Sequence, residues 1–200
     1  MKVVVIKYNS GNTCSVAFAL ERLGIFPTIS DKPEDIQGAD KIIFPGVGEA
    51  GSAMEYLKER KLDMLIASLK QPVLGICLGM QLMCKHSEEG NTSCLGIFNQ
   101  EIKRFEPGLK VPHVGWNTVR NLNTPLFKGI EEEAYMYFVH SFYAENAEGT
   151  VASTDYGVSF SSALQKDNFY GVQFHPEKSG ATGQKVLDNF LALKTGRAGV

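Results

Sequence analysis

Cys77 is the residue whose surroundings point most directly to chemistry. It stands between Gly75 and Gly79 in P-V-L-G-I-C-L-G-M-Q-L-M at 72–83, after a short apolar run and before an amphipathic one. This spacing is that of the G-x-S-x-G nucleophile elbow, with sulfur in place of oxygen. A sharp strand-to-helix turn would lift the thiol into a cleft, and the positive end of the following helix would favour the thiolate. The sequence therefore predicts that Cys77 is a nucleophile.

A base and a carboxylate follow nearly one hundred residues later. In G-V-Q-F-H-P-E at 171–177, His175 and Glu177 lie two residues apart after another apolar run. A carboxylate on one ring nitrogen fixes the imidazole tautomer and leaves the other nitrogen to take the thiol proton. We expect Cys77, His175 and Glu177 to form a triad that cleaves an amide or ester through a thioester. No metal is implied, because the P-C-x-x-C segment that accompanies H-x-E in zinc deaminases is missing.

The loop G-V-G-E-A-G at 46–51 has two interpretations. As G-x-G-x-x-G between a strand and a helix, it predicts a dinucleotide site, although it follows the third expected strand and not the first. The alternative, which we favour, is an oxyanion loop with donors at Val47 and Gly48 and a second donor at the N–H of Leu78. Because β-branched Val47 resists reorientation, we expect this hole to be incomplete until a partner reshapes the loop.

Composition narrows the classes of protein. The chain has 200 residues, 44% hydrophobic content and a net charge of −2, which predict a single domain over 1–200 without a basic patch for nucleic acid. The apolar run at 3–6 is too short for a signal-peptide core or a membrane span, so we expect a cytosolic protein without membrane contact. The remaining cysteines are interpreted as inert buried thiols: Cys14, Cys84 (inside a helix) and Cys94.

The hydrophobic pattern predicts an α/β fold, with a mostly parallel central sheet covered by helices on both faces and an antiparallel extension. In the first part we expect strands at 3–6, 26–29, 41–44 and 72–76 and helices at 12–24, 53–60, 62–69 and 78–86. From about residue 95 we expect closely spaced strands at 101–105, 112–119, 135–142, 150–153, 160–165 and 169–174, then a helix at 184–193. Because sites in such sheets lie at the carboxyl ends of strands, Cys77 and His175 can reach one crevice.

These segments together resemble the class I, triad-type glutamine amidotransferases, over nearly the whole chain. F-P-G-V-G at 44–48, G-I-C-L-G-M-Q at 75–81 and G-V-Q-F-H-P-E at 171–177 carry the resemblance. Within the class, the chain is most similar to the glutaminase subunits of imidazole glycerol phosphate synthase, through S-E-E-G at 87–90, L-G-I-F at 95–98, P-H-V-G-W-N at 112–117, Y-F-V-H-S-F at 137–142 and H-P-E-K-S at 175–179. The resemblance implies a flavodoxin-like fold and hydrolysis of glutamine to glutamate and ammonia, with no cofactor.

The resemblance also implies substrate and partner contacts. Gln81, one helical turn after the nucleophile, and the backbone at Gly48, Ser141 and Phe142 would bind glutamine. The partner would be a (β/α)8-barrel cyclase subunit, in a heterodimer that uses the ammonia for histidine biosynthesis. Only 25 residues follow position 175, which is too few for a synthase domain, so we expect ammonia to be used in trans. The interface candidates are Asn12, His113, Trp116 (otherwise a core anchor), Asn117, Tyr137 and Lys178 (otherwise a solvated lysine).

Three alternatives stay open at the level of the residues. The chain could be the glutaminase subunit of another synthase, of the anthranilate or pyridoxal phosphate type. It could be a cysteine hydrolase of the same broad fold that acts on another amide. The third alternative, a non-catalytic or dinucleotide-binding module, is opposed by the intact set of Cys77, His175 and Glu177.

Overall fold

The computed structural model describes residues 1–9 and 11–194. Its strands are β1 (Val3–Ile6), β2 (Thr28–Ser30), β3 (Lys41–Phe44), β4 (Val73–Ile76), β5 (His86–Ser87), β6 (Thr92–Ser93), β7 (Glu101–Arg104), β8 (His113–Val119), β9 (Ala134–His140), β10 (Phe142–Glu145), β11 (Thr150–Tyr156), β12 (Val158–Lys166) and β13 (Phe169–Val172). Its helices are α1 (Thr13–Glu21), α2 (Pro33–Gln37), α3 (Ala50–Glu59), α4 (Leu62–Ser68), α5 (Leu78–Met83) and α6 (Gly180–Ala192), with short 3-10 helices η1 (Glu89–Asn91), η2 (Pro125–Phe127) and η3 (Pro176–Lys178).

One large sheet runs through the molecule. Its strand order is β2-β1-β3-β4-β13-β12-β10-β7-β5-β6, with β11 paired to β12. Strands β1 to β4 pair in parallel, and every residue of β1, β3 and β4 is buried. Burial on both faces explains their continuous apolar sequences. The predicted α/β fold with an antiparallel extension is therefore confirmed.

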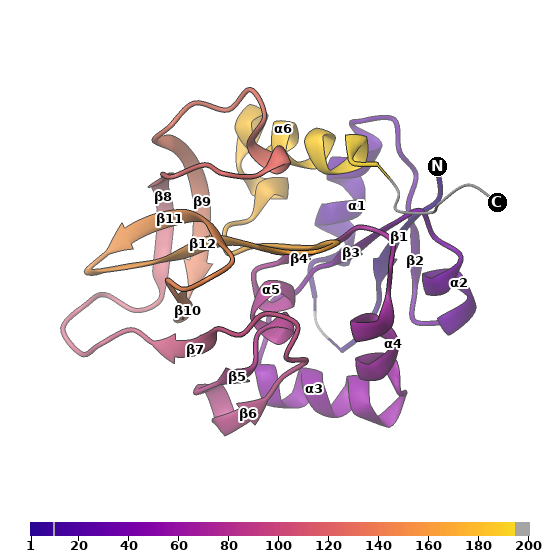
Figure 1. Ribbon diagram of the computed structural model, residues 1–200, viewed down its shortest axis with the longest axis horizontal. Helices are drawn as coiled ribbons and strands as arrows, with labels where there is room; N and C mark the ends of the chain where they lie inside the picture. Colours follow the sequence, from indigo (N-terminus) through magenta and orange to yellow (C-terminus); the bar gives the residue numbers. More distant parts are fainter. Residues whose placement is uncertain (10, 195–200) are drawn as a thin grey trace.

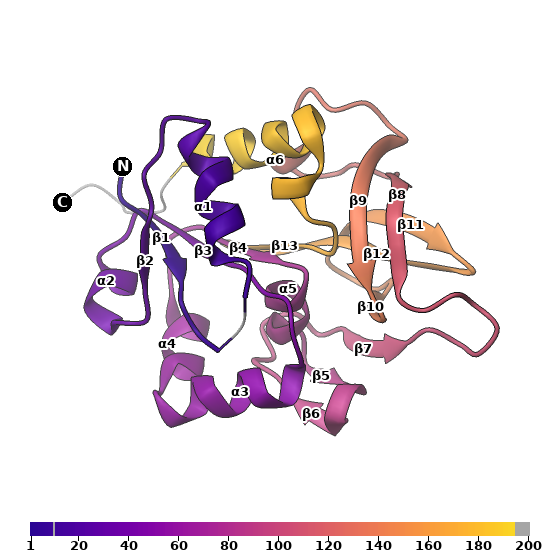
Figure 2. The same ribbon diagram turned by 180° about the vertical axis from the view of Figure 1, so that it is seen from behind.

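Two helical layers cover this sheet (Figures 1 and 2). Helices α1 and α6 lie on one face, together with the small sheet of β8 and β9, and bury Val16, Leu20, Val186 and Phe190 in one hydrophobic cluster. Helices α3, α4 and α5 lie on the opposite face and form a second cluster with α2. The helices thus bury apolar side chains against the sheet, and every residue of α5 is buried.

Strand β13 joins the two halves of the sheet, which corrects the expectation that 169–174 belongs only to the antiparallel extension. It pairs antiparallel with β12, where Val172 faces Ala163. It also pairs in parallel with β4, where Val172 faces Ile76. The chain segments that follow β4 and β13 therefore leave the same edge of the sheet side by side. This pairing positions Cys77 next to the segment that contains His175.

The strand expected at 135–142 is divided in two. Strand β9 ends at His140 and belongs to a two-stranded sheet with β8, whereas β10 begins at Phe142 and joins the large sheet. Ser141 belongs to neither strand. We call His140–Ser141–Phe142 the 140–142 corner. The sequence has no glycine or proline at this corner, so the sequence alone did not reveal the change of sheet.

Other boundaries also differ from the sequence prediction. Helix α5 ends at Met83, because Cys84 has an extended backbone, and His86 lies in strand β5 and not at a helix end. The strand expected at 26–29 is β2, at Thr28–Ser30, and α2 was not predicted, although a proline stands at its first turn. Cys84 is buried as expected, but Cys14 is exposed. Within the described residues, no helix has the length and apolarity to span a bilayer.

Candidate active site

Cys77 lies at a sharp turn between β4 and α5. Its backbone angles are φ 51° and ψ −107°, a conformation that costs a non-glycine residue about 1–3 kcal/mol. The flanking glycines allow this turn to pack: a Cβ at Gly79 would lie 1.8 Å from the carbonyl oxygen of Phe44, and one at Gly75 would lie 2.4 Å from Met83. The predicted elbow geometry is therefore present, and only 6% of Cys77 is exposed.

His175 and Glu177 form a buried pair just beyond β13. Nδ1 of His175 lies 2.7 Å from Oε1 of Glu177, and neither side chain has exposed surface. The backbone N–H of His175 donates to the carbonyl of Tyr137 at 2.9 Å, and the Ser179 hydroxyl donates to the carbonyl of His175 at 2.6 Å. Pro176 then begins η3, which turns Glu177 back toward the ring. The backbone around the imidazole is thus fixed from both sides.

The charges in this site favour a protonated imidazole. Burial opposes the positive charge, but the neighbouring Cys77 sulfur and the Glu177 carboxylate outweigh it and raise the pKa of His175 to about 10. Nε2 of His175 and Oε2 of Glu177 are buried without a hydrogen-bond partner among the described residues. A buried ring nitrogen beside a thiol and without a partner is suited to moving a proton.

A cavity of about 240 Å³ opens over Cys77. It is lined by Val47, Gly48, Cys77, Leu78, Gln81, Glu89, Pro112, Val139, His140, Ser141 and Phe142. The structure therefore brings the predicted nucleophile, the predicted oxyanion donors and the predicted glutamine-binding residues to one concave site. Glu89 was not singled out from the sequence, although it lies within the S-E-E-G segment.

Two glutamines connect the sulfur to the wall of this cavity. Nε2 of Gln81 donates to the carbonyl of Phe142 and to Oε1 of Gln173, both at 2.9 Å. Nε2 of Gln173 contacts Sγ of Cys77 at 3.5 Å, and its side chain is fully buried. Gln173 was missed by the sequence analysis. The signal was available, because an amide side chain in the apolar run G-V-Q-F needs a buried partner.

The start of α3 is closed to phosphate. Oε2 of Glu89 accepts from the N–H of Ala50 at 2.8 Å, while the two oxygens of Glu49 accept from the N–H groups of Gly51 and Ser52 at 2.9 and 2.8 Å. A dinucleotide loop needs these N–H groups for the pyrophosphate. Here carboxylates occupy them and would also repel an anion, so the geometry argues against the dinucleotide interpretation of 46–51.

One predicted oxyanion donor is engaged within the protein. The N–H of Leu78 donates to the carbonyl oxygen of Gly46 at 3.4 Å. Gly48, with φ 138°, follows in the same loop, and Val47 is 36% exposed. The Leu78 amide therefore becomes available to an oxyanion only if the Gly46 carbonyl turns away.

Three of the interface candidates lie on the surface. Trp116 is 54% exposed, so its alternative interpretation as a core anchor is wrong. Its ring lies 6.0 Å from that of Tyr137, edge to face, across the pair of strands β8 and β9. Lys178 is exposed next to Glu177. These side chains form a surface close to the catalytic candidates.

Of the other three candidates, His113 is buried and the two asparagines are partly buried. Asn12 donates from Nδ2 to Oε1 of Glu177 at 2.5 Å, so it supports the carboxylate. His113 is buried, with 4% of its surface exposed. Nδ2 of Asn117 donates to the carbonyl of Asp155 at 3.0 Å and contacts Nε2 of His113 at 3.4 Å. The structure gives these three side chains contacts within the protein.

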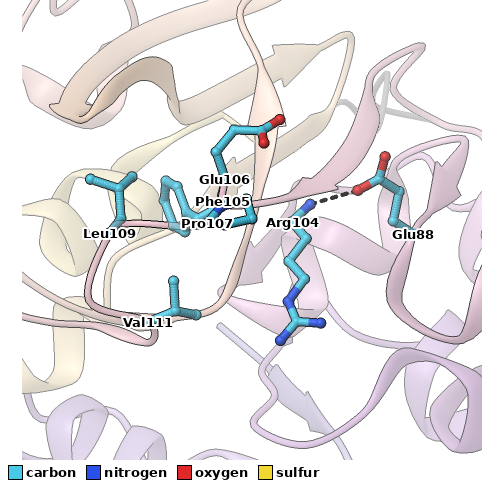
Figure 3. Close-up of a pocket in the computed structure, with 7 residues that line it drawn as sticks. All are labelled: Glu88, Arg104, Phe105, Glu106, Pro107, Leu109 and Val111. Carbon is cyan, nitrogen blue, oxygen red and sulfur yellow. Dashed lines mark hydrogen bonds between the residues drawn. The ribbon is translucent and has the colours of Figure 1, made fainter.

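A larger hollow of about 550 Å³ lies beside the cavity (Figure 3). Its lining residues are Glu88, Arg104, Phe105, Glu106, Pro107, Leu109 and Val111. The backbone N–H of Arg104 donates to Glu88 at 2.8 Å, as the dashed line in Figure 3 indicates. The lining includes no nucleophile and no imidazole, so the smaller cavity over Cys77 is the candidate active site.

Comparisons with known proteins identify the family of the chain. Residues 4–193 match the family model described as glutamine amidotransferase class-I. The chain is 59% identical to the imidazole glycerol phosphate synthase subunit HisH of Bacteroides thetaiotaomicron, over 96% of this chain and 100% of that protein. It is 49% identical to subunit HisH 1 of Vibrio vulnificus, over 96% and 98%.

A solved structure of a glutamine amidotransferase has the same fold. It matches with a TM-score of 0.76 at 20% identity, over 96% of this chain and 97% of that one. The conserved fold, the match to the family model and the identity over full length lead to one assignment. The chain belongs to the class I glutamine amidotransferases and, within them, to the family of HisH subunits of imidazole glycerol phosphate synthase.

Proposed function

We propose that this chain hydrolyses glutamine at Cys77 and delivers the ammonia to the cyclase subunit of imidazole glycerol phosphate synthase, in cytosolic histidine biosynthesis. The observation that carries the proposal is the fully buried pair of His175 and Glu177, 2.7 Å apart, beside a cysteine in a strained elbow. The whole chain, 1–200, acts as one glutaminase domain. The relatives at 59% and 49% identity are named as subunits of that synthase, which supports the choice of partner.

The reaction passes through a thioester. The Cys77 sulfur attacks the side-chain amide carbon of glutamine, while His175 holds the thiol proton and then gives it to the departing nitrogen. Ammonia leaves, and water attacks the glutamyl thioester with the imidazole as base. Glu177 keeps the ring oriented and stabilises its positive charge, and Asn12 in turn holds Glu177. The products are glutamate, ammonia and the free thiol.

The amino-acid end of glutamine is held by the opposite wall of the cavity. Glu89 lines this wall, and burial raises the pKa of its carboxyl group because the negative charge is poorly solvated there. A cation beside the carboxylate would compensate for the lost solvation. We assign Glu89 to the α-ammonium group of glutamine. Gln81 and the backbone at Gly48, Ser141 and Phe142 complete the binding site, as their places around the cavity allow.

The cyclase, a (β/α)8 barrel, docks on the surface formed by Trp116, Tyr137 and Lys178. This surface lies next to the triad, because the carbonyl of Tyr137 holds the backbone of His175. The docking surface is supported by the internal contacts described above, which are made by Asn12, His113 and Asn117. Ammonia then travels a short path into the partner.

Docking also opens the oxyanion hole in this proposal. The Gly46 carbonyl accepts a hydrogen bond from the Leu78 N–H, and β-branched Val47 restricts movement of the loop. The hole therefore forms when the partner and its nucleotide ligand shift residues 46–48. Glutamine turnover measured alone, with the cyclase, and with the cyclase and its nucleotide should rise in that order. Equal rates in all three conditions would refute this part.

The proposed function is tested by comparing two nitrogen sources. With the cyclase present, wild type should form imidazole glycerol phosphate from either glutamine or ammonium salts. Cys77→Ala should lose the reaction with glutamine and keep the reaction with ammonia. Cys14→Ala, which removes an exposed thiol, is the matched control and should keep both. Glutamine-dependent product with Cys77→Ala would overturn the proposal.

A further inference from the structure

Two buried histidines take no part in the reaction described above: His140 lines the cavity, and His113 packs against it. His113 and His140 are 4% and 6% exposed, and Nδ1 of His113 lies 3.0 Å from Nε2 of His140. They stand opposite each other on β8 and β9. Since buried polar side chains with no structural or chemical task are costly, this pair needs an explanation.

The contacts of the pair set the position of every proton. Nδ1 of His140 lies 2.8 Å from the carbonyl oxygen of Phe142, so Nδ1 carries the hydrogen and donates it. In the neutral ring, Nε2 of His140 is then an acceptor, and Nδ1 of His113 donates to it. Nε2 of His113 in turn accepts from Nδ2 of Asn117, at 3.4 Å. Both rings are therefore Nδ1–H tautomers.

The surroundings keep both rings neutral. His113 stacks on Tyr156 with 4.0 Å between ring centroids and on Phe138 with 5.1 Å. Phe105, which lines the hollow in Figure 3, lies 5.3 Å from His140 between ring centroids. Burial lowers the pKa of His113 to about 4 and that of His140 to about 3. A neutral pair keeps one direction of hydrogen bonding at any pH well above these values.

The acceptor at the inner end of this pair is part of the glutamine site. The Phe142 carbonyl receives two hydrogen bonds, one from His140 and one from Gln81. Gln81 continues through Gln173 to Sγ of Cys77. The 140–142 corner is thus held from two sides, and its residues line the cavity together with Val139, whose carbonyl contacts the sulfur at 3.8 Å.

We propose that His140, oriented by His113, is a positioning residue that fixes the 140–142 corner in the shape that binds the amino-acid end of glutamine. This inference rests on the proposed function and adds to it two side chains that have no role in the proposed bond-breaking steps. Without the Nδ1–H donor, the Phe142 carbonyl loses one of its two side-chain hydrogen bonds, and the corner keeps the bond from the Phe105 N–H to the Ser141 carbonyl. Binding of glutamine then weakens, while the thiol and its base stay in place.

Two substitutions separate the hydrogen bond from the packing. His140→Phe keeps a ring of similar size and removes the donor to Phe142. His140→Asn is smaller but presents an amide N–H close to the position of Nδ1. His86→Asn, on β5 and outside the pair, is the control. Loss of the donor should impair glutamine recognition, and the asparagine should restore most of it even though it packs less well.

The readout is a ratio of two labelling rates at Cys77. 6-Diazo-5-oxo-L-norleucine, a glutamine analogue, needs the amino-acid site to reach the thiol, whereas iodoacetamide does not. In His140→Phe the ratio of their second-order rate constants should fall roughly three- to tenfold, the effect of one net hydrogen bond. It should return to within about twofold of wild type in His140→Asn. A general loosening of the fold would change both rates and would not be reversed by asparagine.

The wild-type protein offers a test that needs no variant. Nitrogen-15 chemical shifts of the imidazole rings distinguish Nδ1–H from Nε2–H tautomers. We expect Nδ1–H at both His113 and His140 near pH 7. An Nε2–H tautomer at His140 would overturn the proposal, because the ring then has no hydrogen to donate to Phe142.

These measurements distinguish failure of the proposed function from failure of the role assigned to His140. In Cys77→Ala, labelling of the exposed Cys14 gives the background rate of the glutamine analogue. If the analogue labels wild type no faster than this background, the proposed function fails. If wild type is labelled at Cys77 and His140→Phe has the wild-type ratio, only the role of His140 fails. The same holds if His140→Asn lowers the ratio as far as His140→Phe does.

Discussion

Replacing the carboxylate of Glu177 by an amide is a demanding test of the triad. Glu177→Gln keeps the size and shape of the side chain but removes its charge. In the structure Oε1 accepts two hydrogen bonds, from Nδ1 of His175 at 2.7 Å and from Nδ2 of Asn12 at 2.5 Å. The side chain has no exposed surface, so water does not replace what is lost.

The size of the effect follows from these contacts. A hydrogen bond to a buried charged group contributes about 1.5–3 kcal/mol. The positive charge of His175 belongs to the thiolate–imidazolium form that attacks the amide, so losing the carboxylate destabilises that reactive form and lowers kcat/KM. Since about 1.4 kcal/mol corresponds to a factor of ten in rate, kcat/KM for glutamine should fall roughly 10- to 150-fold.

The assay is release of glutamate in the presence of the cyclase and its nucleotide. Glu59→Gln is the matched control, since Glu59 is 74% exposed and pairs only with Arg60 in the structure described. It should retain wild-type kinetics. The pKa of His175 should also fall in Glu177→Gln, because Glu177 is one of the groups that raise it.

A Glu177→Gln variant with kcat/KM within about threefold of wild type would contradict the triad, because this loss is smaller than that of one charge-assisted hydrogen bond. The orientation of the ring would then be set by the backbone contacts of His175 alone. Denaturant midpoints should be measured in parallel, so that a fall in activity caused by unfolding is recognised.

Three further results are expected. Gly79→Ala should lower the denaturant midpoint far more than Gly96→Ala. The new Cβ at 79 would lie 1.8 Å from the Phe44 carbonyl oxygen, whereas at Gly96 the space is open and only the φ of 67° disfavours alanine. Equal losses would contradict this. Trp116→Ala should weaken cyclase binding roughly 30-fold in titration calorimetry, as expected for an exposed aromatic hot spot, with ammonia-dependent synthesis intact at saturating subunit. Because the pKa of His175 is raised to about 10 from an ordinary value of 6.5, its stabilising contribution is complete below pH 6.5 and is lost as the pH rises toward 10. The difference in free energy of unfolding between wild type and His175→Gln should therefore shrink over that window, and a constant difference would count against the charged pair.

The sequence predicted the parallel half of the fold well, because local chemistry decides it. The runs at 3–6 and 41–44 are apolar throughout, and the structure has β1 and β3 at those residues. The nucleophile turn was equally readable, since the two glycines at 75 and 79 have no other explanation than close approach. In these segments, propensity and tertiary contacts favour the same structure.

The corner at Ser141 could not be predicted, because nothing local marks it. The bend there is imposed by partners far away in sequence, Gln81 and the two sheets that the chain connects. Gln173 and Glu89 were missed for a similar reason: their roles depend on which groups face them. His113 was predicted as a residue of the partner interface, because its pattern on β8 does not reveal the aromatic rings that cover it. Long-range contacts thus decide the residues that periodicity leaves ambiguous.

Glu49 and Glu89 accept hydrogen bonds from the first N–H groups of α3, which has a consequence for how G-x-G-x-x-G loops are recognised from sequence. Glycine spacing describes the path of a backbone, whereas affinity for a nucleotide depends on whether its amide hydrogens are unoccupied. The carboxylate of Glu49 accepts from the same N–H groups that would otherwise bind the phosphate of a nucleotide. A glutamate placed directly after the second glycine is therefore a counter-signal, and a search for nucleotide folds that penalised it would pass over this loop correctly.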